Sequence, residues 1–171
     1  MLNNNNKVLE KKAIQDKQQK LYNAIKENNL TKVAELLKEE KVGPNFKFEG
    51  CSMLFWAVTT NSDNTSDEIV FQLLENRANP NYIGSGRDTP LHFAADRHYI
   101  VKMNHLLKFG ADINVVGSDD STPLHKAVMS SIDKNRLEAV KLLLEMDADI
   151  GILNYEDQTA KEIAQKKDIR K

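Results

Sequence analysis

The four histidines are the first residues to test for chemistry, because imidazole serves both as a metal ligand and as a general base. They are His92, His98, His105 and His125. His98 and His105 lie seven residues apart, and neither has an Asp or Glu four residues away that would complete a metal-binding helix face. The spacing therefore indicates no metal site, and we expect neither a metal nor a cofactor.

The other chemically capable groups are better explained by turn geometry. Gly84-Ser85-Gly86 lacks the full G-x-x-x-x-G-K-[ST] pattern of a phosphate-binding loop. Asp119-Asp120 and Glu156-Asp157 are paired carboxylates, but both fall on expected turns, where Asp is favoured for its backbone conformation. Cys51, the single cysteine, has no histidine nearby in sequence and is expected on an exposed hairpin as an ordinary surface thiol. We therefore expect no catalytic residues and a protein that is not an enzyme.

Composition narrows the class of partner. The chain has 171 residues, with 24 Lys and Arg against 25 Asp and Glu, and a formal net charge of −1. This balance offers no support for a nucleic-acid or membrane-surface partner, since both favour a basic excess. No apolar run reaches the roughly 18–20 residues of a membrane span. The Asn-rich start lacks the apolar core of a secretory signal. We expect a cytoplasmic location, or delivery into a host cell without a cleavable signal peptide.

A repeated phrase organises the sequence. TPLHFAA at residues 89–95 recurs 33 residues later as TPLHKAV at 122–128. Each copy is followed by an amphipathic run and a similar ending, LLKFGAD at 106–112 and LLEMDAD at 143–149, and Asn114 and Asn81 close two such endings. The pattern resembles the ankyrin repeat, which is a hairpin turn, TPLH, a short inner helix, a longer outer helix and a G-A-D-x-N loop. The residues of the two motif copies are Thr89, Pro90, Leu91 and His92, then Thr122, Pro123, Leu124 and His125.

The resemblance implies an all-α solenoid of helix–turn–helix units joined by short β-hairpins, in which the Thr and His of the motif hold the hairpin by hydrogen bonds. Ala24, Ala57, Ala94 and Ala127 recur at intervals of 33, 37 and 33 residues and set the register. In this register residues 1–16 are a polar extension, expected as a frayed helix that leads into an ankyrin repeat domain at 17–171. The expected units are 17–46, 47–83, 84–116, 117–153 and a partial 154–171. Extra residues near 61–66 and 131–135 are expected either to lengthen helices or to project opposite the hairpin tips.

Members of this family bind partners through hairpin tips and the exposed side of the inner helices. The matching positions form what we call the palm, and Phe48, Met129 and Tyr155 are its candidate anchors because they are apolar or aromatic. Isolated exposed apolar residues are also normal on any protein surface, which is the simpler interpretation of these three. The palm comprises Phe48, Glu49, Cys51, Thr59, Thr60, Ser85, Arg87, Asp88, Asp96, Arg97, Ser118, Asp119, Ser121, Met129, Ser130, Tyr155, Glu156 and Gln158.

The resemblance implies a non-catalytic protein–protein interaction module, acting as an adaptor, an inhibitor or a host-directed effector. The alternative is a targeting or regulatory fragment of a larger multidomain protein or enzyme. The expected partner is another protein, and the acidic tips at 119–120 and 156–157 favour one with a basic segment. We expect a monomer with no nucleic-acid or membrane partner. The basic ending at 166–171 is the only feature that favours nucleic acid, and it is better explained as a solvated tail.

Overall fold

The computed structural model describes residues 4–39, 42–60, 63–130 and 135–168. The helices divide into two compact units, Met1–Ala78 and Asn79–Lys171, each with its own packed helices. The helical fold class expected from the repeats is confirmed, and strand pairing within the described ranges is confined to one hairpin of two-residue strands.

The first unit contains two helical pairs. Helix α1 packs against α2 and α3, and α4 packs against the same two helices. Strands β1 and β2 pair antiparallel, with Lys47 opposite Ser52 and Phe48 opposite Cys51. The elements are α1 (Asn4–Lys26), α2 (Leu30–Lys38), β1 (Lys47–Phe48), β2 (Cys51–Ser52), α3 (Met53–Thr59) and α4 (Asn64–Glu75). The core is built from Leu21, Ile25, Val33, Leu36, Met53, Leu54, Ala57, Ile69, Val70 and Leu73.

Helix α1 is longer than the sequence pattern indicated. We expected a frayed helix at 1–16 that leads into a short helix, whereas α1 is one helix of 23 residues that crosses residue 16 without a break. No Gly or Pro interrupts residues 4–26, so nothing in the backbone ends the helix earlier. Only its C-terminal part contributes to the core, since Leu21 and Ile25 are fully buried while Val8 is 65% exposed.

Side-chain caps explain where the helices of the first unit begin. The hydroxyl of Ser52 accepts the backbone N–H of Phe55 at 3.1 Å and caps the start of α3. The cap is therefore present although Phe55 occupies the position of the motif His. Asp63 caps α4 together with Ser66 in a capping box. Helix α4 has 12 residues against nine in α6, so part of the 61–66 insertion lengthens the outer helix. Residues 61–62 lie outside the described ranges.

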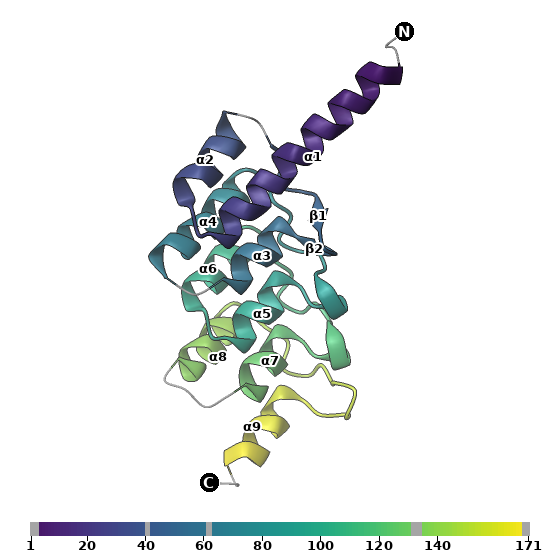
Figure 1. The fold of residues 1–171 in the computed structure, drawn as a ribbon. Coiled ribbons are helices and arrows are strands. Elements are labelled where there is room, and N and C mark those ends of the chain that lie inside the picture. The colour runs from purple at the N-terminus through teal and green to yellow at the C-terminus, as the bar shows by residue number, and fades with distance from the viewer. Residues whose placement is uncertain (1–3, 40–41, 61–62, 131–134, 169–171) are drawn as a thin grey trace. The chain divides into compact units, whose positions relative to one another are not determined.

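The second unit repeats the same arrangement. Inner helix α7 packs between α5 and α9, while outer helix α6 packs on α5 and on α8, and α8 packs on α7 (Figure 1). The elements are η1 (Ser85–Arg87), α5 (Pro90–Asp96), α6 (Ile100–Lys108), η2 (Ser118–Asp120), α7 (Pro123–Met129), α8 (Arg136–Glu145) and α9 (Ala160–Asp168). The core is built from Leu91, Ala94, Ala95, Met103, Leu106, Leu124, Ala127, Val128, Ala139, Leu143, Ala160 and Ile163.

Five-residue turns precede the inner helices of this unit. The N–H of Gly84 donates to the carbonyl of Asp88 at 2.7 Å, and Gly117 donates to Ser121 at 2.9 Å. Asn154 donates to Gln158 at 3.0 Å in the last turn, which leads into α9. The same closure recurs at intervals of 33 and 37 residues and places the turns at the start of each inner helix. The second insertion, near 131–135, falls mostly outside the described residues.

Candidate protein-binding surface

The motif histidine of α5 links its own helix start to the following turn. His92 is 1% exposed, and its Nδ1 accepts the backbone N–H of Thr89 at 3.1 Å. Its Nε2 lies 3.0 Å from the carbonyl oxygen of Ser121 and donates to it. Because Nδ1 is an acceptor and Nε2 a donor, the imidazole is neutral. Burial lowers the pKa of His92, in agreement with this protonation state.

The second motif histidine has the same arrangement in α7. His125 is 1% exposed, its Nδ1 accepts the N–H of Thr122 at 3.2 Å, and its Nε2 donates to the carbonyl of Gln158 at 3.0 Å. Burial lowers the pKa of His125 as well. The structural role that the resemblance implied for both histidines is therefore seen in the contacts. They position the turns that carry the palm residues.

A polar network holds the turn before α7 against the turn before α5. Asp88 accepts the N–H of Ser118 at 2.8 Å and its hydroxyl at 2.9 Å, and the Lys126 ammonium lies 3.7 Å from the same carboxylate. Gly117 precedes Ser118 where no side chain fits, because a Cβ there would stand 2.3 Å from Asp88 Oδ1 and 2.8 Å from His92 Nε2. Asp88 and Ser118 are therefore structural groups as well as palm residues.

The asparagines that close the repeats bridge neighbouring loops. Asn81 donates to the carbonyl of Gly110 at 2.9 Å and accepts the N–H of Asp112 at 2.7 Å. Asn114 accepts the N–H of Asp149 at 2.8 Å, one repeat further along. The sequence pattern identified these positions but not the function of their amides, which could have been inferred from their recurrence beside turns.

Several palm residues of the second unit are exposed as expected, and most of their charges are paired. Met129 is 40% exposed and Tyr155 is 61% exposed. Arg87 lies 3.7 Å from the carboxylate of Asp120, and Arg97 lies 3.7 Å from that of Asp96. Arg87 thus pairs with an acidic residue of the next turn. The other exposed palm residues of this unit are Asp119 and Glu156.

The tip of the last turn is acidic and partly ordered by its own hydrogen bonds. The hydroxyl of Tyr155 donates to Glu156 at 2.9 Å, and this bond raises the pKa of the Tyr155 phenol. The N–H of Tyr155 donates to the carbonyl of Asp119 at 3.1 Å, so these two palm tips are neighbours. Asp119 and Asp157 each have a positive φ of 55°, a conformation that Asp tolerates better than most residues.

Two palm positions are buried, contrary to the sequence-based expectation. Ser121 is 0% exposed because it closes the five-residue turn and its carbonyl accepts from His92. Cys51 is 5% exposed because it lies in β2, directly before α3, and not at the hairpin tip. Neither residue is available to a partner in this conformation. The side chain of Ser85 lies outside the described atoms.

Other palm side chains are half-buried and already engaged. Ser130 donates to the carbonyl of Asp96 at 2.5 Å. Thr59 and Thr60 donate to carbonyls of their own helix, at 2.8 and 2.6 Å. Gln158 is held through its backbone carbonyl, which accepts from His125. Because these hydroxyls already donate within the chain, the residues contribute to the shape of the surface more than to its capacity for new hydrogen bonds.

In the first unit the palm residue Phe48 belongs to an aromatic cluster, of which the sequence pattern identified only Phe48. The ring of Phe48 stacks on Tyr22 with centroids 4.2 Å apart, and Tyr22 meets Trp56 edge-on at 5.4 Å. The Lys26 ammonium lies 4.9 Å from the centroid of the Trp56 ring. Burial, and then the neighbouring Glu49 that accepts its hydroxyl at 3.2 Å, raise the pKa of Tyr22. The sequence pattern did not identify Tyr22 and Trp56, although both are aromatic residues on helices and both contact Phe48 in the fold.

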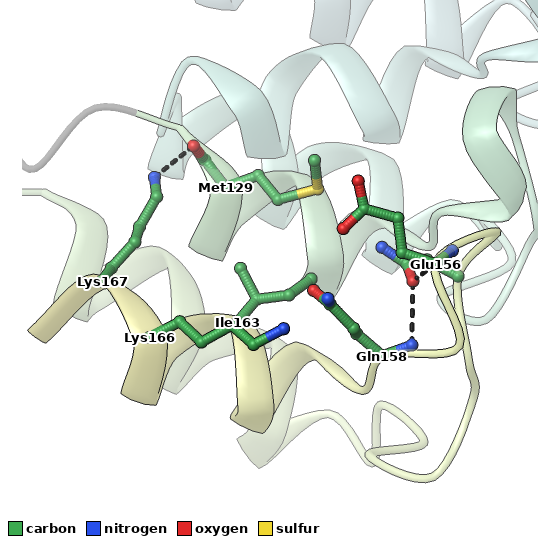
Figure 2. A pocket seen from close by; sticks show the side chains of 7 residues that line it. Met129, Glu156, Gln158, Ile163, Lys166 and Lys167 are labelled. Carbon is green, nitrogen blue, oxygen red and sulfur yellow. Dashed lines mark hydrogen bonds between the residues drawn. The ribbon is translucent and has the colours of Figure 1, made fainter. Parts of the chain in front are cut away.

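A hollow of about 270 Å³ opens between the end of α7, the turn at 154–158 and helix α9 (Figure 2). Met129 and Ile163 give it an apolar part, Glu156 and Gln158 come from the turn, and Lys166 and Lys167 come from α9. We had expected residues 166–171 to form a solvated tail, but Lys167 contacts the rest of the chain. Its ammonium donates to the carbonyls of Met129 and Ser130, and burial lowers its pKa.

A second, apolar groove of about 350 Å³ lies among α7, α8 and α9. Helix α8 has apolar residues on two sides, because Leu143 is fully buried while Leu137 and Leu144 are 77% and 45% exposed. The same groove includes Val128 and Ile150. This face was not among the sequence-based candidates, since the register assigned partner contacts to inner helices and turns alone.

The described part of the chain contains no group of three or more His, Cys, Asp or Glu residues arranged to hold a metal ion. In the same ranges, none of the helices combines the length and apolar character that crossing a membrane requires. Helix α1 is long enough, but its sequence is rich in Lys, Gln and Asn.

Comparison with known proteins agrees with the repeated turns and helices. The model of the family described as ankyrin repeats in three copies matches residues 62–154, which is 93 of 171 residues. A protein of Fowlpox virus (strain NVSL), named as an ankyrin repeat protein, is 30% identical over 155 residues, which cover 89% of this chain and 19% of that protein. The chain thus spans less than a fifth of the length of this curated relative. With its TPLH motifs, linked turns and family match, the chain belongs to the ankyrin repeat family.

Proposed function

We propose that the chain is a non-catalytic module that binds a partner protein on the palm of its second unit. Ankyrin repeats are generally protein-interaction modules. The observation that supports this surface most directly is the exposure of Met129 and Tyr155, at 40% and 61%, beside turns that are otherwise polar. Apolar and aromatic side chains of this kind dominate binding energies when a partner covers them.

The charges of the palm favour a partner with a basic segment. Arg87 pairs with Asp120, and Lys126 lies beside Asp88, so part of the acidic charge is offset within the chain. Asp119, Glu156 and Asp157 remain exposed at the tips. Their field would attract a cationic segment and speed its association, while the apolar anchors would slow its dissociation.

Adaptor, inhibitor and host-directed effector all fit this proposal, because each requires binding without chemistry. A second candidate is a targeting or regulatory segment within a longer protein. It is supported by the viral relative, in which the matching region is 19% of the length. Both candidates use the same surface, and they differ in what else the natural protein carries.

The test uses the full chain and one partner identified by cross-linking and mass spectrometry. We expect the double variant Met129→Ala with Tyr155→Ala to weaken binding at least tenfold, mainly by faster dissociation, as measured by surface plasmon resonance. The matched control is Val101→Ala with Leu137→Ala, which truncates exposed apolar residues of the outer helices α6 and α8. If the palm variant changes the affinity by less than twofold while its fold is intact, the palm is not the binding site.

A further inference from the structure

The hollow beside Met129 has opposite charges on its two walls. Glu156 belongs to the turn before α9, whereas Lys166 lies on α9 itself (Figure 2). Ile163 precedes Lys166 by three residues, so the two share one face of the helix. The hollow therefore offers an apolar surface that is mainly Met129, with the edge of the largely buried Ile163, an anion from the turn and a cation from the helix.

The walls of this hollow are held by hydrogen bonds in the unbound chain. Asn154 is 4% exposed, and its side-chain oxygen accepts the N–H groups of Glu156 and Gln158, both at 3.0 Å. On the other side, Lys167 donates to the carbonyls of Met129 and Ser130, where a cation also complements the C-terminal end of α7. A site whose walls are already fixed loses less conformational entropy when it binds.

The dimensions and lining of the hollow favour a side chain over a free small molecule. Its volume of about 270 Å³ is below the roughly 300–1,000 Å³ that is usual for small-molecule sites. Exposed Met129 is one of its lining residues, so a segment that contacts Met129 on the palm lies beside the hollow. Lys167 already uses its ammonium on the carbonyls of Met129 and Ser130, which leaves Lys166 as the other cation that lines the hollow.

We propose that this hollow receives one linear segment of the partner protein, which carries three kinds of side chain. An apolar side chain packs on Met129 and against the edge of Ile163, a Lys or Arg pairs with Glu156, and an Asp or Glu pairs with Lys166. This inference rests on the proposed function and specifies the chemistry of the partner. It predicts a mixed-charge segment, whereas the acidic tips considered alone predict a purely basic one.

The first experiment selects phage-displayed random dodecapeptides on the full chain. We expect the enriched peptides to carry an aliphatic or aromatic residue between one basic and one acidic residue. Purely basic enriched peptides, or a failure to enrich any peptide over the unselected library, would overturn the inference.

The second experiment measures the best enriched peptide, labelled with fluorescein, by fluorescence polarisation. We expect Lys166→Glu to weaken its binding at least tenfold, and exchange of the acidic residue of the peptide for Lys to restore most of that loss. Glu156→Lys should be rescued in the same way by a Glu at the basic position of the peptide. Lys161→Glu is the matched control, because it makes the same charge change at an exposed position of α9 that borders the apolar groove.

The outcomes separate this inference from the function on which it rests. If Lys166→Glu and Lys161→Glu weaken the peptide equally, net charge controls binding and the site is not specific. If the partner protein depends on Met129 and Tyr155 but not on Glu156 or Lys166, the palm binds it and the mixed-charge inference fails. If the partner is indifferent to all four positions, the proposed palm fails as well.

Discussion

The Nε2 atom of His92 lies 3.0 Å from the carbonyl oxygen of Ser121, which closes the turn of the following repeat. The same relationship joins His125 to Gln158 at 3.0 Å. In both cases the other ring nitrogen accepts a backbone N–H at the start of the helix that carries the histidine. Each imidazole therefore fixes one turn relative to the previous helix, and the palm depends on these contacts for its shape.

Loss of one of these imidazoles should destabilise the fold. His125→Ala would leave the N–H of Thr122 without the ring nitrogen that accepts it, and would remove one of the two donors to the carbonyl of Gln158. We expect a loss of about 1–3 kcal/mol in the free energy of unfolding, the usual scale for orphaned buried polar groups. Urea denaturation followed by circular dichroism measures it, with Gln165→Ala at an exposed position of α9 as the control. An unchanged midpoint would show that the contact contributes nothing.

The same histidines should make the stability depend on pH. Burial lowers the pKa of both below the usual 6.5, so between the folded value and 6.5 the unfolded chain binds protons that the folded chain does not. Their contribution is complete above pH 6.5 and is lost as the pH falls from there toward the folded pKa. We expect the urea midpoint to decrease when the pH is lowered from 7.5 to 5.5. The decrease should be smaller in His92→Ala or His125→Ala. Equal pH profiles in all three proteins would refute this linkage.

The sequence predicted those features of the fold that depend on periodicity and on the motif residues. The spacing of Ala94 and Ala127 placed α5 and α7 correctly, and the TPLH phrases marked their first turns. The last unit, which was expected to be partial, contains the inner helix α9 within the described residues. These features are local, so residue types and intervals are sufficient to infer them.

The exposure of the palm depended on contacts that periodicity does not encode. Ser121 and Cys51 occupy tip-like positions in the repeat but are buried by a turn closure and by the hairpin. The partners of Asp88 are Ser118 and Lys126 from the next repeat. Such partners lie about 30–38 residues away and become visible only when neighbouring turns are superposed by the fold.

Gly117 should tolerate no side chain. A Cβ at this position would stand 2.3 Å from Asp88 Oδ1 and 2.8 Å from His92 Nε2, and both groups are held by other hydrogen bonds. We expect Gly117→Ala to destabilise the chain by about 1–3 kcal/mol, the usual range for overpacking. Gly43→Ala is the control because a Cβ there meets nothing within 4 Å. Thermal unfolding of both variants measures the difference, and equal melting temperatures would contradict the close approach.

Adjacent leucines of α8 should respond very differently to truncation. Leu143 is 0% exposed and Leu144 is 45% exposed. Leu143→Ala should cost about 2–5 kcal/mol, since it removes buried methyl groups and leaves a cavity. Leu144→Ala should cost under about 1 kcal/mol, because much of that side chain already contacts water. If urea denaturation gave similar losses for both variants, the exposed side of α8 would be covered in solution.

The asparagine bridges provide a graded test of how loops of neighbouring repeats are held together. Asn81 makes two such bonds, to the carbonyl of Gly110 and the N–H of Asp112, whereas Asn114 makes one, to the N–H of Asp149. With about 0.5–1.5 kcal/mol for each net hydrogen bond, Asn81→Ala should lower the free energy of unfolding more than Asn114→Ala. Hydrogen exchange should show the N–H of Asp112 less protected in the first variant and that of Asp149 in the second. A larger loss for Asn114→Ala, or exchange unchanged at both amides, would mean that the bridges do not restrain these loops.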